Sequence, residues 1–141
     1  MKNSATIKFL SLSQNESFIR MCVSSFIAPL NPTLDEIADI KTAVSEGVTN
    51  AIVHGYPDTI GQIEVRMSYD KNVVHIEILD DGVGIKDIEQ AKEPFFTTCL
   101  DGTRSGMGFT VMESFMDQMN VVSAFEEGTR VVLTKKLGGK K

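Results

Sequence analysis

Two periodicities in the apolar residues divide the chain into predicted strands and helices. Residues 61–70 alternate apolar and polar positions with the period of a half-buried strand, and the apolar positions are Ile63, Val65, Met67 and Tyr69. Residues 18–27 and 37–51 instead repeat apolar side chains at the spacing of one helix face. The same patterns predict a third helix and the full set of strands, at 106–119 and at 5–12, 61–70, 73–80, 120–125 and 129–137.

The first two helices both begin at residues that favour a helix start. Ser13 and Glu16 have the spacing of a capping box, in which each side chain bonds the backbone N–H of the other residue. Thr33 and Glu36 repeat that spacing at the start of the second helix. Gly55 is a typical C-terminal stop, so we expect the second helix to run from this capping box to Gly55.

The order of these elements predicts a single α+β domain that covers residues 1–141. The strands lie in hairpins, which favours a mostly antiparallel sheet covered on one face by about three helices, as a two-layer α/β sandwich. The segment from 82 to 104 exceeds ordinary loop lengths, which predicts a flexible functional lid at about 86–104. Residues 138–141 are expected to form a frayed tail.

Composition and charge narrow the classes of function. The 141 residues are 42% hydrophobic and 23% charged, a globular balance that argues against large-scale disorder. The net charge of -5 argues against a general nucleic-acid binder, which usually carries a basic face. No apolar run reaches the roughly 20 residues that span a bilayer, and the N-terminal segment lacks a signal-peptide pattern. We therefore expect no membrane contact. Cys22 and Cys99 are far apart and have no metal-ligand spacing, so we expect reduced cysteines in a cytoplasmic protein.

A row of polar side chains on the second helix is the first candidate for chemistry. Glu46, Asn50 and His54 are four residues apart, so each is turned only about 40° from the last. Glu46 and Asn50 fall opposite the predicted core stripe, which consists of Ile37, Ile40, Val44, Val48 and Ala51. An ordinary solvated face also explains these two residues, and His54 suits the capping of the last helical carbonyls.

The second candidate is "ILDDGVGI" at 78–85, where a strand ends in two carboxylates followed by spaced glycines. Gly82 and Gly84 would let the backbone approach a ligand closely. A carboxylate at a strand end can accept a hydrogen bond from an exocyclic amine such as that of adenine. The alternative is a tight turn at the strand exit, since Asp and Gly are common turn residues.

The third candidate is "TRSGMGFTVMESF" at 103–115, where glycines lead directly into an apolar helix. Free N–H groups at a helix N-terminus attract anions, and an arginine adds a charged fork suited to phosphate. The residues concerned are Arg104, Ser105, Gly106, Met107 and Gly108. A glycine-containing loop before a helix is the alternative, and the Walker A and Rossmann patterns are both missing.

In "EEGTRVVL" at 126–133, Thr129 follows what is otherwise a simple hairpin turn.

Taken in order, these motifs resemble those of a known ATP-binding superfamily. The order resembles that of the ATP-binding fold shared by gyrase, Hsp90, histidine kinases and MutL. It consists of Glu-x-x-x-Asn on a helix, Asp-x-Gly-x-Gly after a strand, a lid, Gly-x-Gly before a helix and a final Gly-Thr. The stretches "VSEGVTNAIVHGYP", "ILDDGVGI", "EPFFTT" and "RSGMGFTVMESFMD" narrow the resemblance to the anti-sigma F family of spore-forming bacteria, with the anti-sigma B serine kinases as close relatives. The resemblance covers nearly the whole chain and implies a histidine-kinase-like ATPase fold.

The resemblance implies that the chain binds ATP or ADP with Mg²⁺ and assigns residues to the phosphates. Asn50 would ligate the Mg²⁺ that bridges the ATP phosphates, and Glu46 would act as general base toward the attacking hydroxyl. The backbone amides of residues 105–108 would hold phosphate oxygens, with Arg104 near the γ-phosphate. Phosphoryl transfer needs positioning, charge neutralisation and a proton acceptor, which these positions could supply.

The resemblance also assigns residues to the base of the nucleotide. Asp80 would accept the adenine amine, supported by Thr129 through a water. Gly82 and Gly84 would let the backbone close on the nucleotide. Asp81 occupies a position that the wider superfamily often fills with Asn, so the sequence assigns it no role.

The family likeness further implies an ATP-dependent protein-serine kinase that is also an anti-sigma factor. It would inhibit a sporulation sigma factor and phosphorylate a serine of an anti-anti-sigma protein, which inactivates that protein. Glu16 and Arg20 lie on the first helix, in the region that the family uses to meet both partners, although Arg20 could equally be a solubilising charge. The edge of the first strand could join two copies in a homodimer. Direct contact with nucleic acid is not expected.

Two other functions remain open from the residues. A histidine-kinase catalytic domain is disfavoured because the chain has only two histidines, His54 and His75, and no helical hairpin precedes the domain to present a phosphoacceptor. A non-catalytic module that uses ATP only as a structural ligand is disfavoured by the joint presence of Glu46 and Asn50.

Overall fold

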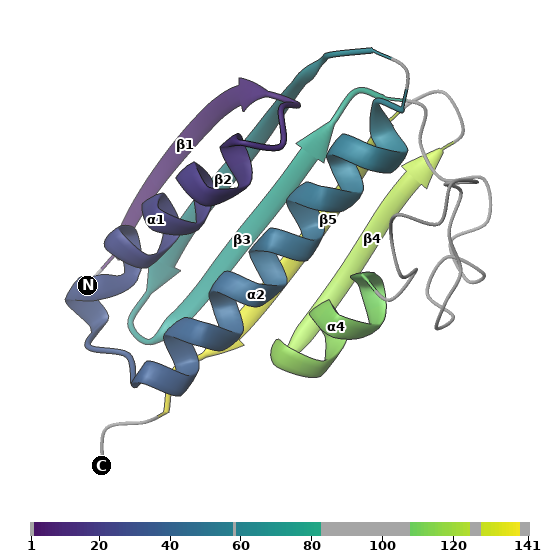
Figure 1. The fold of residues 1–141 in the computed structure, drawn as a ribbon. Coiled ribbons are helices and arrows are strands. Elements are labelled where there is room, and N and C mark those ends of the chain that lie inside the picture. The colour runs from purple at the N-terminus through teal and green to yellow at the C-terminus, as the bar shows by residue number, and fades with distance from the viewer. Residues whose placement is uncertain (1, 58, 83–107, 125–127, 139–141) are drawn as a thin grey trace.

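The computed structural model describes residues 2–57, 59–82, 108–124 and 128–138, which form a layer of strands and a layer of helices (Figure 1). The strands are β1 (Lys2–Leu10), β2 (Gln62–Asp70), β3 (Val73–Asp80), β4 (Gln118–Ala124) and β5 (Gly128–Lys136). The helices are α1 (Asn15–Ile27), α2 (Leu34–Asn50) and α4 (Gly108–Phe115). Two short helical turns follow the first two helices: the 3-10 turn η1 (Ala28–Leu30) and the π turn η2 (Ala51–Gly55).

The five strands form one sheet in the order β1-β2-β3-β5-β4, and every neighbouring pair is antiparallel. Figure 1 shows α1, α2 and α4 over the same face of that sheet. α1 packs on β1 and β2, α2 packs on β3, and α4 packs on β4. The α+β sandwich with helices on one face, predicted from the apolar pattern, is therefore confirmed.

Alternating residues of the strands fill the space beneath the helices. The four apolar positions predicted for β2 are all buried: Ile63, Val65, Met67 and Tyr69. From α2, the core receives Ile40, Val44 and Val48 with no exposed surface, and each such side chain contributes about 1.5–3 kcal/mol through burial. Ile37, predicted for the same stripe, packs against this core but is only partly buried.

The two predicted capping boxes had different outcomes. At α2 the box is present: the Thr33 hydroxyl accepts the Glu36 N–H at 3.1 Å, and the Glu36 carboxylate accepts the Thr33 N–H at 2.9 Å. At α1 the predicted box is wrong, because the N-cap is Gln14 and no side chain caps the helix. The Asn15 side chain instead donates to the Leu10 carbonyl at 2.9 Å, which ties the start of α1 to the end of β1.

Tertiary pairing moved several predicted boundaries. β1 spans 2–10 rather than 5–12, because it pairs with β2 along its whole length, from Lys2 opposite Asp70 to Leu10 opposite Gln62. The third predicted helix, 106–119, is α4 only to Phe115, and the chain then enters β4 beside β5. The predicted lid at 86–104 lies outside the described residues. In the predicted tail, Gly138 donates its N–H to Glu36 at 3.0 Å, and 139–141 lie outside the described residues.

Candidate functional site

The end of α2, the end of β3 and the start of β5 come together at one end of the sheet (Figure 1). The second helix reaches Gly55 as predicted, but its last five residues form the π turn η2 rather than an α turn. π turns widen a helix and occur frequently at functional sites. Here η2 packs against β3 and β5, so the widened turn carries the backbone at Gly55 against the end of β3.

Asp80, the last residue of β3, is the most deeply buried charged side chain among the described residues, with 8% of its surface exposed. Its carboxylate accepts the Gly82 N–H at 2.9 Å, and it also accepts the backbone N–H of Thr129, the residue opposite it on β5. The pKa of Asp80 is raised from 3.8 to about 6, mainly by burial, and the charge of Asp81 contributes in the same direction. The two N–H donors act in the opposite direction, since they stabilise the ionised form.

Three glycines allow this close packing, and with Asp80 and Thr129 they form what we call the Asp80 cluster. A Cβ on Gly55 would lie 2.8 Å from a carboxylate oxygen of Asp80. A Cβ on Gly82 would overlap the Gly55 carbonyl oxygen, and one on Gly128 would overlap the backbone oxygen of Asp80. Gly128 also has φ +90°, a conformation that side-chain-bearing residues rarely adopt. Backbone therefore surrounds the Asp80 carboxylate where other residues would place side chains.

The polar row on α2 is less solvated than its helical projection indicates. Glu46 and Asn50 are both half-buried. The side-chain amide nitrogen of Asn50 is fully buried and has no hydrogen-bond partner in the described part of the chain. Buried polar groups are nearly always paired, so this amide is a marked exception. Gly47 brings α2 close to the sheet, since a Cβ there would overlap the end of the Ile78 side chain.

The structure describes only part of the predicted nucleotide site. It brings together Asp80, Gly82 and Thr129, with Asn50 at the end of the helix that leads into η2. Gly108 is the first residue of α4. The remaining predicted residues lie outside the described part of the chain: Gly84, Arg104, Ser105, Gly106 and Met107.

The two predicted partner-binding residues lie on α1, away from the Asp80 cluster. Glu16 and Arg20 are each half-buried, and both the partner-binding role and the solubilising role of Arg20 stay predictions. The Arg20 guanidinium reaches across to α2 and donates to the Ser45 hydroxyl at 3.5 Å. Arg20 therefore contacts the residue that precedes Glu46.

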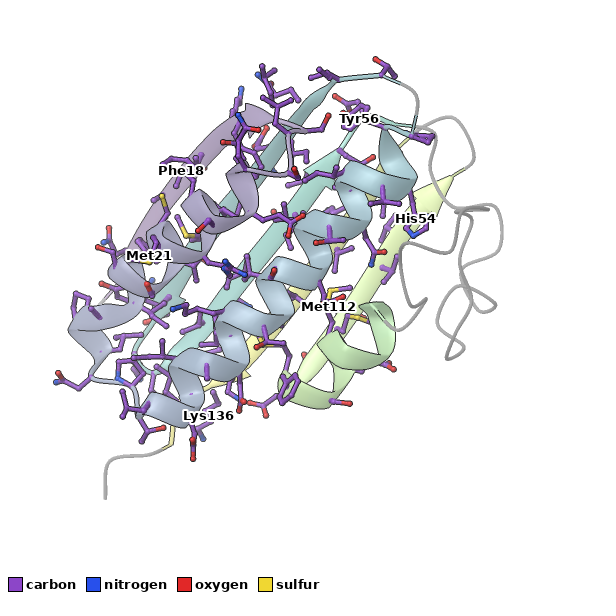
Figure 2. The ribbon with its side chains drawn as sticks, in the orientation of Figure 1. Phe18, Met21, His54, Tyr56, Met112 and Lys136 are labelled. Atoms are coloured by element: carbon purple, nitrogen blue, oxygen red, sulfur yellow. The ribbon has the colours of Figure 1, made fainter. Side chains whose placement is uncertain are left out.

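The sequence patterns do not single out Tyr56, which follows η2 and bonds the residue next to Asp80 (Tyr56 is labelled in Figure 2). Its hydroxyl donates to the Gln62 carbonyl and accepts the Asp81 N–H, both at 2.8 Å. Its ring lies over Gly61, where a Cβ would overlap it. The only available signal was the dipeptide Gly55-Tyr56 at the end of the helix, which has no periodicity of its own.

Metal ligands are few in this region. Within the described ranges, no group of three His, Cys, Asp or Glu side chains could hold a metal ion. Magnesium typically uses only one or two protein ligands and takes the rest from water and substrate phosphates, so a single amide oxygen from Asn50 fits that mode of binding.

Among the described helices, none combines the length and apolar character needed to cross a membrane.

The comparisons with known proteins agree with this arrangement. The family model described as "Histidine kinase-like ATPase domain" matches residues 11–135. The anti-sigma F factor of Thermoanaerobacter sp. (strain X514) is 53% identical over 139 residues, covering 99% of this chain and 97% of the relative. The anti-sigma F factor of Bacillus subtilis (strain 168) is 51% identical over 142 residues, covering 100% of this chain and 97% of the relative. The chain belongs to the anti-sigma F factor family, which carries this ATPase domain.

Solved structures match this family member in fold. A Mycobacterium tuberculosis chain described by its RsbU and RsbW domains has a TM-score of 0.70 at 21% identity, covering 96% of this chain and 32% of that one. The catalytic domain of the histidine kinase ThkA has a TM-score of 0.56 at 19% identity, covering 94% of this chain and 96% of that one. The antiparallel sheet with helices on one face is therefore shared with histidine-kinase-like ATPase domains.

Proposed function

We propose that this chain is an ATP-dependent protein-serine kinase that also inhibits a sigma factor. Its substrate is a serine of an anti-anti-sigma protein, and phosphorylation prevents that protein from releasing the sigma factor. Membership of the anti-sigma F factor family and the histidine kinase-like ATPase domain support both halves of the proposal. The family membership also supports a cytoplasmic location, where sigma factors act.

The observation that carries the proposal is the Asp80 carboxyl. Buried carboxylates are usually paired with a cation, because an isolated buried charge is costly. In the described ranges no cationic side chain forms an ion pair with Asp80, and only N–H donors contact it. An acceptor of this kind at a strand end suits a neutral N–H donor such as the exocyclic amine of adenine. Thr129, opposite Asp80, is the residue expected to assist through a water.

Asn50 is the residue proposed to hold Mg²⁺. Its buried amide nitrogen has no partner within the ranges that the structure describes, which is consistent with a side chain held for a ligand rather than for internal bonding. Its amide oxygen is a ligand type that Mg²⁺ accepts. When bound, the ion neutralises charge on the phosphates. The orientation of Asn50 in α2 is this chain's own contribution.

Glu46 is the proposed general base, one helical turn before Asn50. It would take the proton from the serine hydroxyl as the new bond forms between that oxygen and the γ-phosphorus. The bond from the γ-phosphorus to the bridging oxygen breaks, and ADP leaves with that oxygen. The roles of Gly84, of Arg104 and of the amides of residues 105–108 rest on the family likeness alone.

Partner contacts and self-association complete the proposal. Glu16 and Arg20 on α1 are assigned to the sigma factor and to the anti-anti-sigma substrate. In the sheet that the described residues form, β1 is an edge strand with β2 as its one neighbour, so its other edge can receive a second copy. Such a joint would extend the sheet across a two-fold axis and give a homodimer.

The test uses the full-length protein, radiolabelled ATP and candidate partners. Phosphoserine on a small partner is the expected product, with sigma-factor binding in the presence of ATP or ADP. Glu46→Ala should abolish transfer and leave ATP binding nearly intact, whereas Glu113→Ala, an exposed carboxylate on α4, should behave as wild type. Near wild-type phosphorylation by Glu46→Ala would remove Glu46 from the reaction. Phosphohistidine, or no transfer to any partner, would overturn the kinase assignment.

A further inference from the structure

Tyr56, labelled in Figure 2, joins two strand ends through its hydroxyl, and one of them is next to Asp80. The hydroxyl donates to the Gln62 carbonyl at the start of β2 and accepts the Asp81 N–H just after β3, at 2.8 Å in each case. Burial raises the pKa of Tyr56 above its ordinary value, so the phenol stays protonated at neutral pH. A protonated phenol can donate and accept at the same time, and both capacities are used here.

The hydroxyl lies at the position where the β2–β3 ladder would otherwise continue. Ile63 pairs with Asp80 at the end of that ladder, so one further step of the same register would place Gln62 opposite Asp81. The Tyr56 hydroxyl replaces the direct backbone bond between these two residues, because it accepts from one and donates to the other. The ladder therefore ends at Asp80, and the chain leaves the sheet toward Gly55.

The ring that carries this hydroxyl rests on a backbone that is itself held in place. Gly61 lies beneath it, and a Cβ there would overlap the ring. Gly61 is bonded on both sides to Ser11: its N–H donates to the Ser11 hydroxyl at 3.0 Å, and its carbonyl accepts the Ser11 N–H at 2.9 Å. Ser11 is buried, so these two bonds are shielded from water. The position of the Tyr56 hydroxyl is thus set before any ligand binds.

The Asp81 N–H is the backbone group between the two ends of a short side-chain turn. On one side is Asp80, and on the other is Gly82, whose N–H is bonded to the Asp80 carboxylate. The bond from Asp81 to Tyr56 therefore restrains the middle of this three-residue turn. Restraining the turn also restrains the direction in which the Asp80 carboxylate points.

We propose that Tyr56 is a positioning residue for recognition of the nucleotide base. It holds the turn at 80–82 so that the Asp80 carboxylate is oriented to accept the exocyclic amine of adenine. This inference rests on the proposed nucleotide function. The effect falls on affinity and on base selectivity, because Tyr56 bonds the segment that reads the base and not the segment assigned to the phosphates.

The test is Tyr56→Phe in the full-length protein, which removes the hydroxyl and keeps the ring over Gly61. Binding of ATP and GTP is measured by titration calorimetry, and kcat is measured at saturating ATP. The loss of two neutral hydrogen bonds is expected to weaken ATP binding by about fivefold to tenfold, with little change for GTP and in kcat. Tyr69→Phe is the matched control, because Tyr69 lies toward the other end of β2 and packs against Phe26. It should keep the wild-type ratio of ATP to GTP affinity.

A second variant displaces the ring without removing the hydroxyl. Gly61→Ala places a methyl group where the Tyr56 ring lies, so it should lower the ATP-to-GTP ratio in the same direction. If Tyr56→Phe lowers the melting temperature but keeps the wild-type ratio, the role of Tyr56 is structural only and the inference is wrong. Equal binding of ATP and GTP by the wild-type protein would overturn this inference alone, whereas binding of neither nucleotide would overturn the proposed function and this inference with it.

Discussion

The first and last turns of α2 belong to one helix, yet they satisfy their polar groups in different ways. At the first turn, Thr33 and Glu36 bond each other's backbone, and the second carboxylate oxygen of Glu36 accepts the Gly138 N–H. At the last turn, Asn50 has a buried amide nitrogen without a partner in the described part of the chain, and the helix continues as a π turn. The capping groups at the start of the helix therefore have partners, whereas the Asn50 amide nitrogen at its end has none among the described residues.

The surroundings of the two ends differ in the same sense. The contacts of the first turn are largely between residues three positions apart. They stabilise the helix and use the polar groups of the capping box. The last turn approaches the Asp80 cluster, where backbone from three segments meets around one buried carboxyl. Buried polar groups without hydrogen-bond partners and other locally unfavourable features tend to occur at functional sites, where some stability is lost in favour of binding. The end of α2 is therefore where the proposed nucleotide site lies, whereas the start of α2 only stabilises the helix.

The largest effect is expected from Gly82→Ala, a substitution that disrupts the close packing at the end of α2. In Gly82→Ala the new Cβ would overlap the Gly55 carbonyl oxygen, so backbone must move and the Asp80 turn with it. We expect a loss of about 3 kcal/mol in the free energy of unfolding, together with loss of nucleotide binding. Urea denaturation and titration calorimetry measure the two effects. Gly138→Ala is the control near the first turn, where a Cβ meets nothing within 4 Å, and it should be neutral.

The second prediction concerns pH and the Asp80 carboxyl. Its pKa is 3.8 ordinarily and about 6 in the fold, so the folded state holds the proton more tightly than the unfolded state. The stability that this group contributes is therefore complete below about pH 4 and is lost as pH rises through 6, by about 3 kcal/mol in total. Asp80→Asn should lack this component. Unfolding measured from pH 4 to 7 tests it, and parallel curves for the two proteins would contradict it.

The third prediction compares two residues that share a sequence pattern. Thr33→Ala removes the capping bond to the Glu36 N–H and should cost about 1 kcal/mol of stability. Ser13→Ala should change stability by less than about 0.5 kcal/mol, because α1 has no side-chain cap. Nucleotide binding should be unchanged in both. Equal losses in the two variants would show that the cap geometry does not account for the difference.

The smallest expected effect on stability is at Asn50. Among the described residues the amide nitrogen of Asn50 has no hydrogen-bond partner, so Asn50→Ala removes an unsatisfied buried group and gains up to about 0.7 kcal/mol of helix propensity. Without nucleotide, the variant should be as stable as wild type or slightly more so. With nucleotide, its Mg²⁺-dependent affinity should fall. A variant that is clearly destabilised and binds nucleotide normally would make Asn50 a structural residue.

The sequence predicted much of the fold, and it named candidate site residues that stay predictions. The alternation at Ile63, Val65 and Met67 correctly gave the buried face of β2, since a period of two is a local property of a strand. Glu46 and Asn50 were correctly placed on α2, while His54 lies in η2, and the burial of the Asn50 amide was not predicted. That burial depends on what packs over the helix from elsewhere in the chain.

The two capping boxes show the limit of local patterns. Ser13 and Thr33 carry the same signal, and only Thr33 uses it. At α1 the side chain of Asn15 instead bonds the end of β1, so a contact with the preceding strand tied down the helix start. Tyr56 was missed for a related reason, because its partner Asp81 is 25 residues away and no spacing rule connects them.

The amino-acid sequence alone predicted the order of strands and helices, their buried faces and the family motifs. Each of these depends on a short hydrophobic periodicity or on a short sequence motif. The pKa of Asp80, the orphaned amide of Asn50 and the bridging hydroxyl of Tyr56 were decided only by the tertiary structure. Desolvation and hydrogen-bond partners depend on all groups within a few ångströms, and in a sheet these come from segments far apart in the chain.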